Sequence, residues 1–168
     1  ANLALEGKDT VGLVVADEEV RHFLEPTGSK SFLYQFLDTL ANVVPQNEIA
    51  WTKIADYLLP RIGQACYLVI LSDLEGDPTD FMEACKKFRA GKHRLFVISP
   101  FGPWFETQRY DLTPMDILIG EAIQDGLVQK RTDLFKKLTN YEAPAISVGP
   151  NDMLANVISE FQKIKRNS

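Results

Sequence analysis

The chain has 168 residues, of which 45% are hydrophobic and 24% are charged, and its formal net charge is −5 at pH 7. This composition is typical of a soluble globular protein and predicts a single domain over residues 1–168. The acidic balance argues against nucleic-acid binding, because phosphate neutralisation needs a basic face. No apolar stretch reaches the length of a membrane span, no signal peptide opens the chain, and two cysteines cannot build a disulfide framework, which together predict a cytoplasmic location.

The first half of the chain predicts a hairpin and two helices. Two short apolar runs, 11–16 and 20–24, flank an acidic link and are typical of antiparallel strands. Apolar residues then recur at helical spacing from about residue 30 to residue 43, and Ser29 is the expected cap. Asn47 is the expected cap of a second helix.

The second half predicts three strands that alternate with helices. The expected strands are 66–71, 94–99 and 145–148, and the expected helices are 78–90, 113–139 and 151–165. Strands that alternate with helices form right-handed units around a mostly parallel sheet. The pattern therefore predicts an α/β fold, a three-layer Rossmann-like sandwich with the antiparallel hairpin at its edge.

The first strand of the second half ends at the main candidate site. Its apolar run is followed directly by Ser72 and Asp73. Open α/β sheets bind ligands and metals at the carboxyl ends of their strands, so these residues are candidate ligands. Asp77 and Asp80 could join Asp73 in an acidic metal cluster, but their positions at a helix start favour a cap and a first-turn carboxylate.

An aromatic loop follows the next strand and contains Phe101, Trp104 and Phe105. Two interpretations stay open: the aromatic residues anchor a long loop, or they form a partner-binding surface. Asp77 is expected at the same edge of the sheet and is a further candidate for partner binding.

The remaining polar residues do not complete a catalytic constellation. His22 and His93 belong to different elements and have no Cys or Asp at ligand spacing, which favours strand-edge or turn histidines over zinc binding or catalysis. Residues 26–31 hold Gly, Lys and Ser before a helix but lack the spacing of a phosphate-binding loop. We therefore expect the chain not to be an enzyme.

The order of these segments resembles a known family. The segments that carry the resemblance are 10–17, 23–26, 32–40, 45–48 and 68–74. Together they resemble the C-terminal half of a von Willebrand factor A-like domain, in particular the uncharacterised prokaryotic family often encoded beside MoxR-type AAA+ ATPases. The first central strand of such a domain carries Asp-x-Ser-x-Ser, and nothing before Val11 matches it, so the resemblance implies either a fragment of a longer parent or a shortened relative of the family.

The resemblance also implies a degraded metal-ion-dependent adhesion site. Asp73 matches the closing aspartate of the family motif, with Ser72 beside it, but Asn47 and Glu48 stand where the family has a threonine. Magnesium requires near-octahedral oxygen ligands. We therefore expect no cofactor, unless an upstream strand supplies the missing Mg²⁺ ligands.

The function that the resemblance implies is a non-catalytic protein-interaction module that docks a partner, such as a MoxR-type ATPase, around Asp73 and Trp104. Family members often carry membrane helices upstream, which implies a membrane-anchored parent holding this soluble segment in the cytoplasm. The alternative is a small-molecule or nucleotide-binding Rossmann-like domain or enzyme. A missing strand would also leave apolar strand edges near Val11 and Val69 unpaired, which favours self-association.

Overall fold

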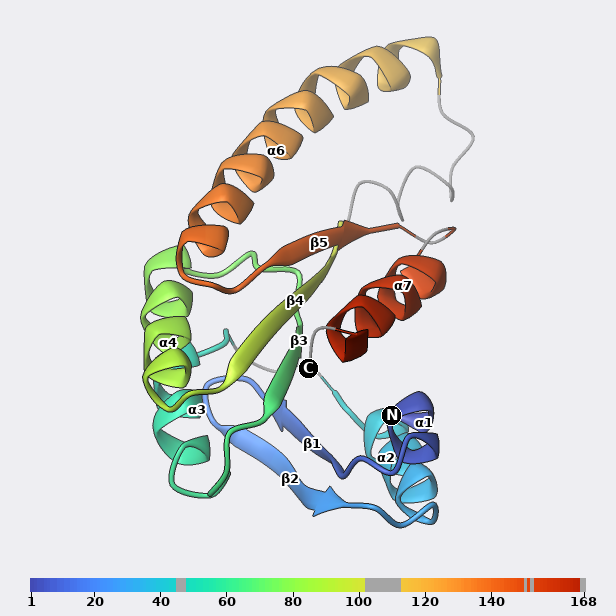
Figure 1. Cartoon of the computed structure of the whole chain (residues 1–168). Coiled ribbons are helices and arrows are strands. Elements are labelled where there is room, and N and C mark those ends of the chain that lie inside the picture. The colour runs from blue at the N-terminus through green and yellow to red at the C-terminus, as the bar shows by residue number, and fades with distance from the viewer. Residues whose placement is uncertain (45–47, 102–112, 150, 152, 167–168) are drawn as a thin grey trace. The chain divides into compact units, whose positions relative to one another are not determined.

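The computed structural model describes residues 1–44, 48–101, 113–149, 151 and 153–166. The chain divides into two compact units, Ala1–Gly63 and Gln64–Ser168. It is a mixed α/β protein with a two-stranded antiparallel sheet in the first unit and a three-stranded parallel sheet in the second (Figure 1). Among the described residues, no helix is long and apolar enough to cross a membrane.

An antiparallel hairpin organises the first unit. Strand β1 (Val11–Ala16) pairs with β2 (Val20–Thr27), which confirms the predicted hairpin. The two strands approach closely at Gly12, where an added Cβ would lie 2.8 Å from the carbonyl oxygen of Leu24. A side chain larger than hydrogen at this position would collide with the partner strand, so the sequence places glycine there.

Three helices accompany the hairpin, and their starts differ from the prediction. They are α1 (Asn2–Glu6), α2 (Phe32–Ala41) and α3 (Trp51–Leu58). The N-cap of α2 is Ser31 rather than Ser29, because the Ser29 hydroxyl accepts the Ser31 N–H at 3.3 Å and closes a turn before the helix. The N-cap of α3 is Ala50, and Asn47 lies outside the described residues.

The parallel sheet of the second unit has β4 at its centre. Its strands are β3 (Tyr67–Leu71), β4 (Arg94–Pro100) and β5 (Ala145–Val148), in the order β3-β4-β5. All three strands were predicted, within one residue at each end. Five consecutive residues of β4, 95–99, are buried, because this strand is paired on both edges and covered on both faces.

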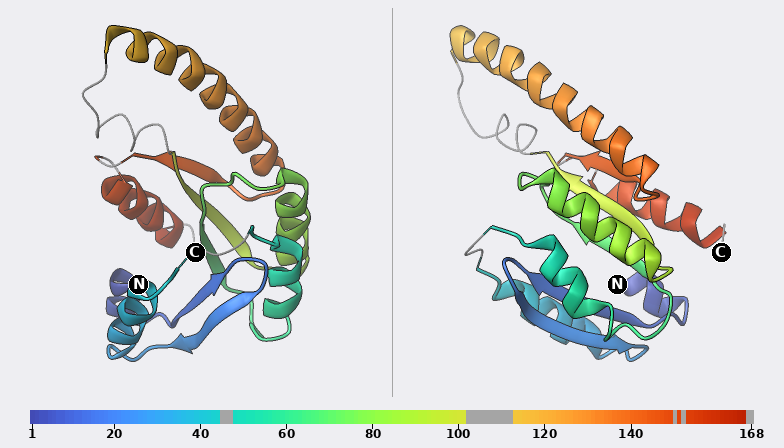
Figure 2. Two further views of the ribbon diagram at one scale, coloured as in Figure 1. Left: turned by 180° about the vertical axis from the view of Figure 1, so that it is seen from behind. Right: turned by 90° about the vertical axis from the view of Figure 1, so that its left-hand side faces the viewer.

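Helices cover the two faces of this sheet. They are α4 (Pro78–Ala90), α6 (Pro114–Asn140) and α7 (Met153–Arg166). Val157 of α7 packs against Phe96, Ile98 and Val148, which form the core of one face. Helices α4 and α7 lie on opposite sides of the sheet (Figure 2), so the second unit has the layered arrangement that a Rossmann-like fold requires.

The hairpin and the parallel strands form separate sheets. Strand β1 pairs with β2, and β3 pairs with β4. The sequence predicts the hairpin at the edge of the parallel sheet, but among the described strands none joins β1 to β3 by backbone hydrogen bonds. Each unit therefore has a sheet of its own.

Candidate functional site

The carboxyl edge of the parallel sheet brings together polar groups from three elements. Ser72 and Asp73 follow β3, Ser99 lies near the end of β4, and Arg131 belongs to α6. The N–H of Ser72 donates to the carbonyl oxygen of Ile98 at 3.2 Å, which extends the β3–β4 ladder to this edge. The residues after β3 therefore lie beside the end of β4, as parallel pairing in register requires.

A tight turn holds Asp73. The Ser72 hydroxyl accepts the N–H of Leu74 at 3.1 Å, and the Asp73 carboxylate accepts the N–H of Glu75 at 3.3 Å. Leu74 has a φ of 59°, a left-handed conformation that costs a residue with a side chain about 1–2 kcal/mol. Asp73 itself is exposed, so the turn presents a carboxylate in a fixed position at the edge of the sheet.

Asp77 caps the helix that follows this turn. Its carboxylate accepts the N–H of Thr79 at 2.8 Å, Pro78 occupies the first helical turn, and Asp80 is the acidic residue of that turn. The predicted cap interpretation of Asp77 and Asp80 is therefore confirmed. The partner-binding role of Asp77 stays a prediction.

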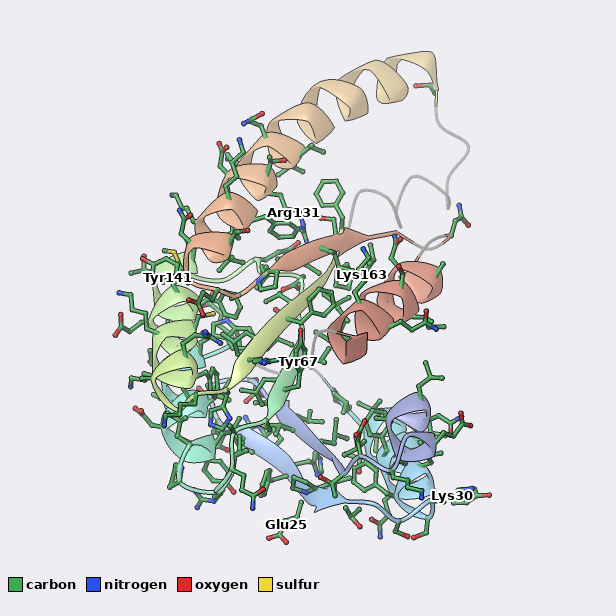
Figure 3. All side chains as sticks on the ribbon, viewed as in Figure 1. Glu25, Lys30, Tyr67, Arg131, Tyr141 and Lys163 are labelled. Carbon is green, nitrogen blue, oxygen red and sulfur yellow. The ribbon has the colours of Figure 1, made fainter. Side chains whose placement is uncertain are left out.

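Arg131 is the functional candidate that the sequence analysis missed. Its guanidinium donates to the Ser99 hydroxyl and to the carbonyl oxygen of Pro100, the latter at 2.8 Å, and Ser99 is fully buried. The guanidinium carbon lies 5.0 Å from the ring centroid of Phe101 and 5.6 Å from that of Phe135. Figure 3 shows the Arg131 side chain between α6 and the sheet.

The sequence does hold a weak signal for Arg131. Arg131 shares a helix face with Phe135 and Leu138, at positions i, i+4 and i+7, and this face is buried or half-buried. A cation on the apolar face of a helix needs a partner across the interface. The spacing alone does not identify that partner, because Ser99 is 32 residues away in the sequence.

The acidic and basic groups at this edge differ in how far they are exposed to solvent. Burial lowers the pKa of Arg131, and the carboxylates of Asp73 and Glu75 partly oppose that shift. Both carboxylates belong to exposed residues, whereas the guanidinium is half-buried and bonded to the end of β4. The edge therefore offers accessible negative charge, which suits a basic or hydrogen-bond-donating ligand surface.

The residues at the predicted metal site do not by themselves fit magnesium. Among the described residues, no three His, Cys, Asp or Glu side chains form a group that could hold a metal ion. Ser72 and Asp73 contribute one hydroxyl and one carboxylate, and each already accepts a backbone N–H. An octahedral cation needs more oxygen ligands, so metal binding with ligands from an upstream strand stays a prediction.

The aromatic loop is described only at its start. Phe101 is buried, its N–H donates to the carbonyl oxygen of Val148 at 3.1 Å, and its ring faces the Arg131 guanidinium. This position fits the anchoring interpretation for Phe101. Trp104 and Phe105 lie outside the described residues, so their predicted binding role stays a prediction.

A cysteine and a histidine meet at the opposite, amino edge of the sheet, although the sequence analysis expected neither histidine to have such a neighbour. The Cys66 N–H donates to Nδ1 of His93 at 3.3 Å, and Cys66 Sγ lies 3.3 Å from the same nitrogen. Burial raises the pKa of the Cys66 thiol and lowers the pKa of His93. Both shifts favour the neutral forms of the thiol and the imidazole, because burial disfavours the charged forms.

Comparisons with known proteins give no further identification. The chain matches no protein-family model, no curated protein and no solved structure. The resemblance to a von Willebrand A-like domain therefore stays a prediction, and the structure supports its α/β, Rossmann-like character.

Proposed function

We propose that this chain is a non-catalytic protein-interaction module of von Willebrand A-like type that docks a partner at the carboxyl edge around Asp73. The observation that supports it most is the exposed Asp73 carboxylate, held by the turn at Leu74 where the parallel strand ends. Binding residues are commonly carried by loops at this edge of α/β sheets. The resemblance supplies the partner class, a MoxR-type AAA+ ATPase.

The charges of the edge favour docking without a metal. In the intact family site, an acidic residue of the partner completes the coordination of the metal ion. Here the exposed carboxylates of Asp73 and Glu75 would repel an acidic partner unless a metal ion lay between these carboxylates and the partner. The partner surface that fits this edge therefore presents lysine or arginine side chains.

Binding of the ATPase tests the proposal. A MoxR-type ATPase from the same organism is titrated into the chain and into the Asp73→Ala variant. Loss of a charged contact at an interface costs about 1–3 kcal/mol, so we expect affinity to fall roughly 5- to 150-fold. The matched control is Asp38→Ala, which removes an exposed carboxylate from α2. Equal affinity of all three proteins, or no binding by any, would contradict the proposal.

A metal titration tests the mode of docking. Mg²⁺ and Mn²⁺ are titrated calorimetrically into the chain beside the Asp73→Ala control. We expect no saturable heat, because Ser72 and Asp73 supply too few oxygen ligands. Saturable binding that disappears in Asp73→Ala would show that Asp73 is a metal ligand and that docking uses the ion.

A second candidate function is binding of an anionic small molecule at the same edge. The observation in its favour is Arg131, whose Nε is buried without a hydrogen-bond partner among the described residues. The carboxylates of Asp73 and Glu75 oppose it by repelling anions. Titration with nucleotides and inorganic phosphate separates the two candidates: saturable binding weakened by Arg131→Lys, but not by Lys130→Ala, would favour the small-molecule function.

A further inference from the structure

The contact between Cys66 and His93 lies where the chain enters the second unit. This unit begins at Gln64, and residues 63–65 belong to no helix or strand. The Cys66 N–H donates to Nδ1 of His93 at 3.3 Å, and the Cys66 carbonyl oxygen accepts the N–H of Arg94 at 2.9 Å. These two hydrogen bonds fix the residue that precedes β3, and one of them depends on an imidazole ring.

The hydrogen bond from the backbone determines the tautomer of this ring. A backbone N–H can only donate, so Nδ1 of His93 must direct a lone pair toward Cys66. In the neutral imidazole the proton is then on Nε2. Cys66 Sγ lies 3.3 Å from the same nitrogen, so the S–H can share this lone pair as a second, weaker donor. Both donors of Cys66 therefore require an unprotonated Nδ1.

Protonation of the ring reverses the role of Nδ1. Both nitrogens of an imidazolium are donors, so the Nδ1–H of His93 and the N–H of Cys66 would point at each other. Sγ of Cys66 can accept from the protonated ring, but the backbone N–H loses its acceptor. A single proton is therefore enough to remove the hydrogen bond that holds the N–H of Cys66.

We propose that His93 is an acid-sensitive switch in the second unit: a proton taken up at Nδ1 breaks the hydrogen bond from Cys66 and releases residues 64–65 from the amino edge of the sheet. The Cys66 carbonyl oxygen does not depend on the ring, because its donor is the Arg94 N–H, so β3 itself stays paired with β4. All of these contacts lie within the second unit, and the inference does not rest on the proposed docking function.

The surroundings of His93 place the switch at acidic pH. The ring is 3% exposed and packs edge-to-face against Phe88, with 6.5 Å between the ring centroids. Burial lowers the pKa of His93 below its ordinary value of 6.5, because it disfavours the charged form. Arg89 donates to the His93 carbonyl oxygen at 3.0 Å, and its ion pair with Glu142 offsets its charge. The other titratable or charged groups near the ring are Cys66, Lys92 and Arg94.

Hydrogen exchange of the whole chain tests the switch without any substitution. As His93 is protonated, we expect the protection of the Cys66 N–H, relative to the unstructured-chain rate at each pH, to fall roughly 2- to 12-fold, the range for loss of one hydrogen bond. The internal control is the Ser72 N–H after β3, which donates to the carbonyl oxygen of Ile98 and should keep its protection. An equal fall at both positions, or no fall at either, would overturn the proposal.

A nitrogen NMR titration tests the chemistry of the ring. We expect the His93 ring to carry its proton on Nε2 at neutral pH, and the Cys66 amide signal to shift with the midpoint of that ring, below pH 6.5. His93→Gln should remove this shift, whereas His22→Gln, at an exposed position on β2, should leave it unchanged. A proton on Nδ1 at neutral pH, or a Cys66 shift that persists in His93→Gln, would overturn the proposal.

Discussion

Arg131 joins α6 to the end of β4 through the Ser99 hydroxyl and the Pro100 carbonyl. Arg131→Ala would remove the donor to the fully buried Ser99 hydroxyl. A buried polar group without its partner costs about 1–3 kcal/mol, so we expect the free energy of unfolding to fall by about that amount. Urea denaturation measures it, and Lys130→Ala, at an exposed neighbour, should change it by less than about 0.5 kcal/mol. An equal loss in both variants would contradict this role.

His93 makes stability depend on pH. Burial lowers its pKa below the ordinary value of 6.5, so between that lowered pKa and pH 6.5 the unfolded chain binds a proton that the folded chain does not. The stabilisation is present above pH 6.5 and is lost as the pH falls through the lowered pKa. Urea unfolding from about pH 7 to about pH 4 should show a decrease that is smaller in His93→Gln.

The exposed His22 provides the control for that measurement. His22→Gln should leave the acid-side decrease in the free energy of unfolding unchanged, because this side chain lies in an exposed position on β2. The same decrease in His93→Gln as in the wild-type chain would contradict the assignment to the buried histidine.

At the scale of elements, the hairpin depends on Gly12. A Cβ there would lie 2.8 Å from the Leu24 carbonyl oxygen, whereas a Cβ at Gly28 would meet nothing within 4 Å. Forcing extra atoms into a packed position costs about 1–3 kcal/mol. We expect Gly12→Ala to lower the free energy of unfolding by that amount and Gly28→Ala to cost much less. Thermal unfolding followed by circular dichroism measures the stability of both variants. An equal loss of stability in Gly12→Ala and Gly28→Ala would contradict the close approach of the two strands at Gly12.

The start of α4 depends on the Asp77 cap. Asp77→Ala removes the acceptor of the Thr79 N–H, and loss of such a cap costs about 1 kcal/mol. Asp77→Asn keeps an acceptor oxygen, so it should lower the free energy of unfolding by only a few tenths of about 1 kcal/mol. Urea midpoints of the two variants measure the difference, and identical midpoints would show that the cap hydrogen bond does not stabilise the helix.

The elements that the sequence predicts well are those with local signals. Strand 145–148 is a bounded apolar run, and Asp77 followed by Pro78 identifies a helix start. The start of α2 was predicted two residues early, because the Ser29 hydroxyl bonds the Ser31 N–H in a preceding turn. Short polar side chains can close either a cap or a turn, and the sequence does not distinguish the two.

The residues of the candidate site show the same difference between local signals and long-range contacts. Ser72 and Asp73 were predictable, because the end of a parallel strand defines the edge of the sheet. The contacts of Arg131 with Ser99 and of Cys66 with His93 were not, because they join residues 32 and 27 apart in the sequence. Only the packing of helices and strands brings such residues together.

At the scale of the whole molecule, the second unit holds the proposed docking edge. Asp73, Ser99 and Arg131 all belong to this unit, so the geometry of the site is contained in it.

Hydrogen exchange with and without the MoxR-type ATPase tests the docking edge most directly. The N–H groups of Leu74 and Glu75 bond to side-chain oxygens in a surface turn, so they should exchange quickly in the unbound chain. The proposed function predicts slower exchange over residues 72–77 when the ATPase binds, with residues 91–94 at the other end of the sheet unchanged. Protection confined to another part of the chain, or no protection anywhere, would contradict it.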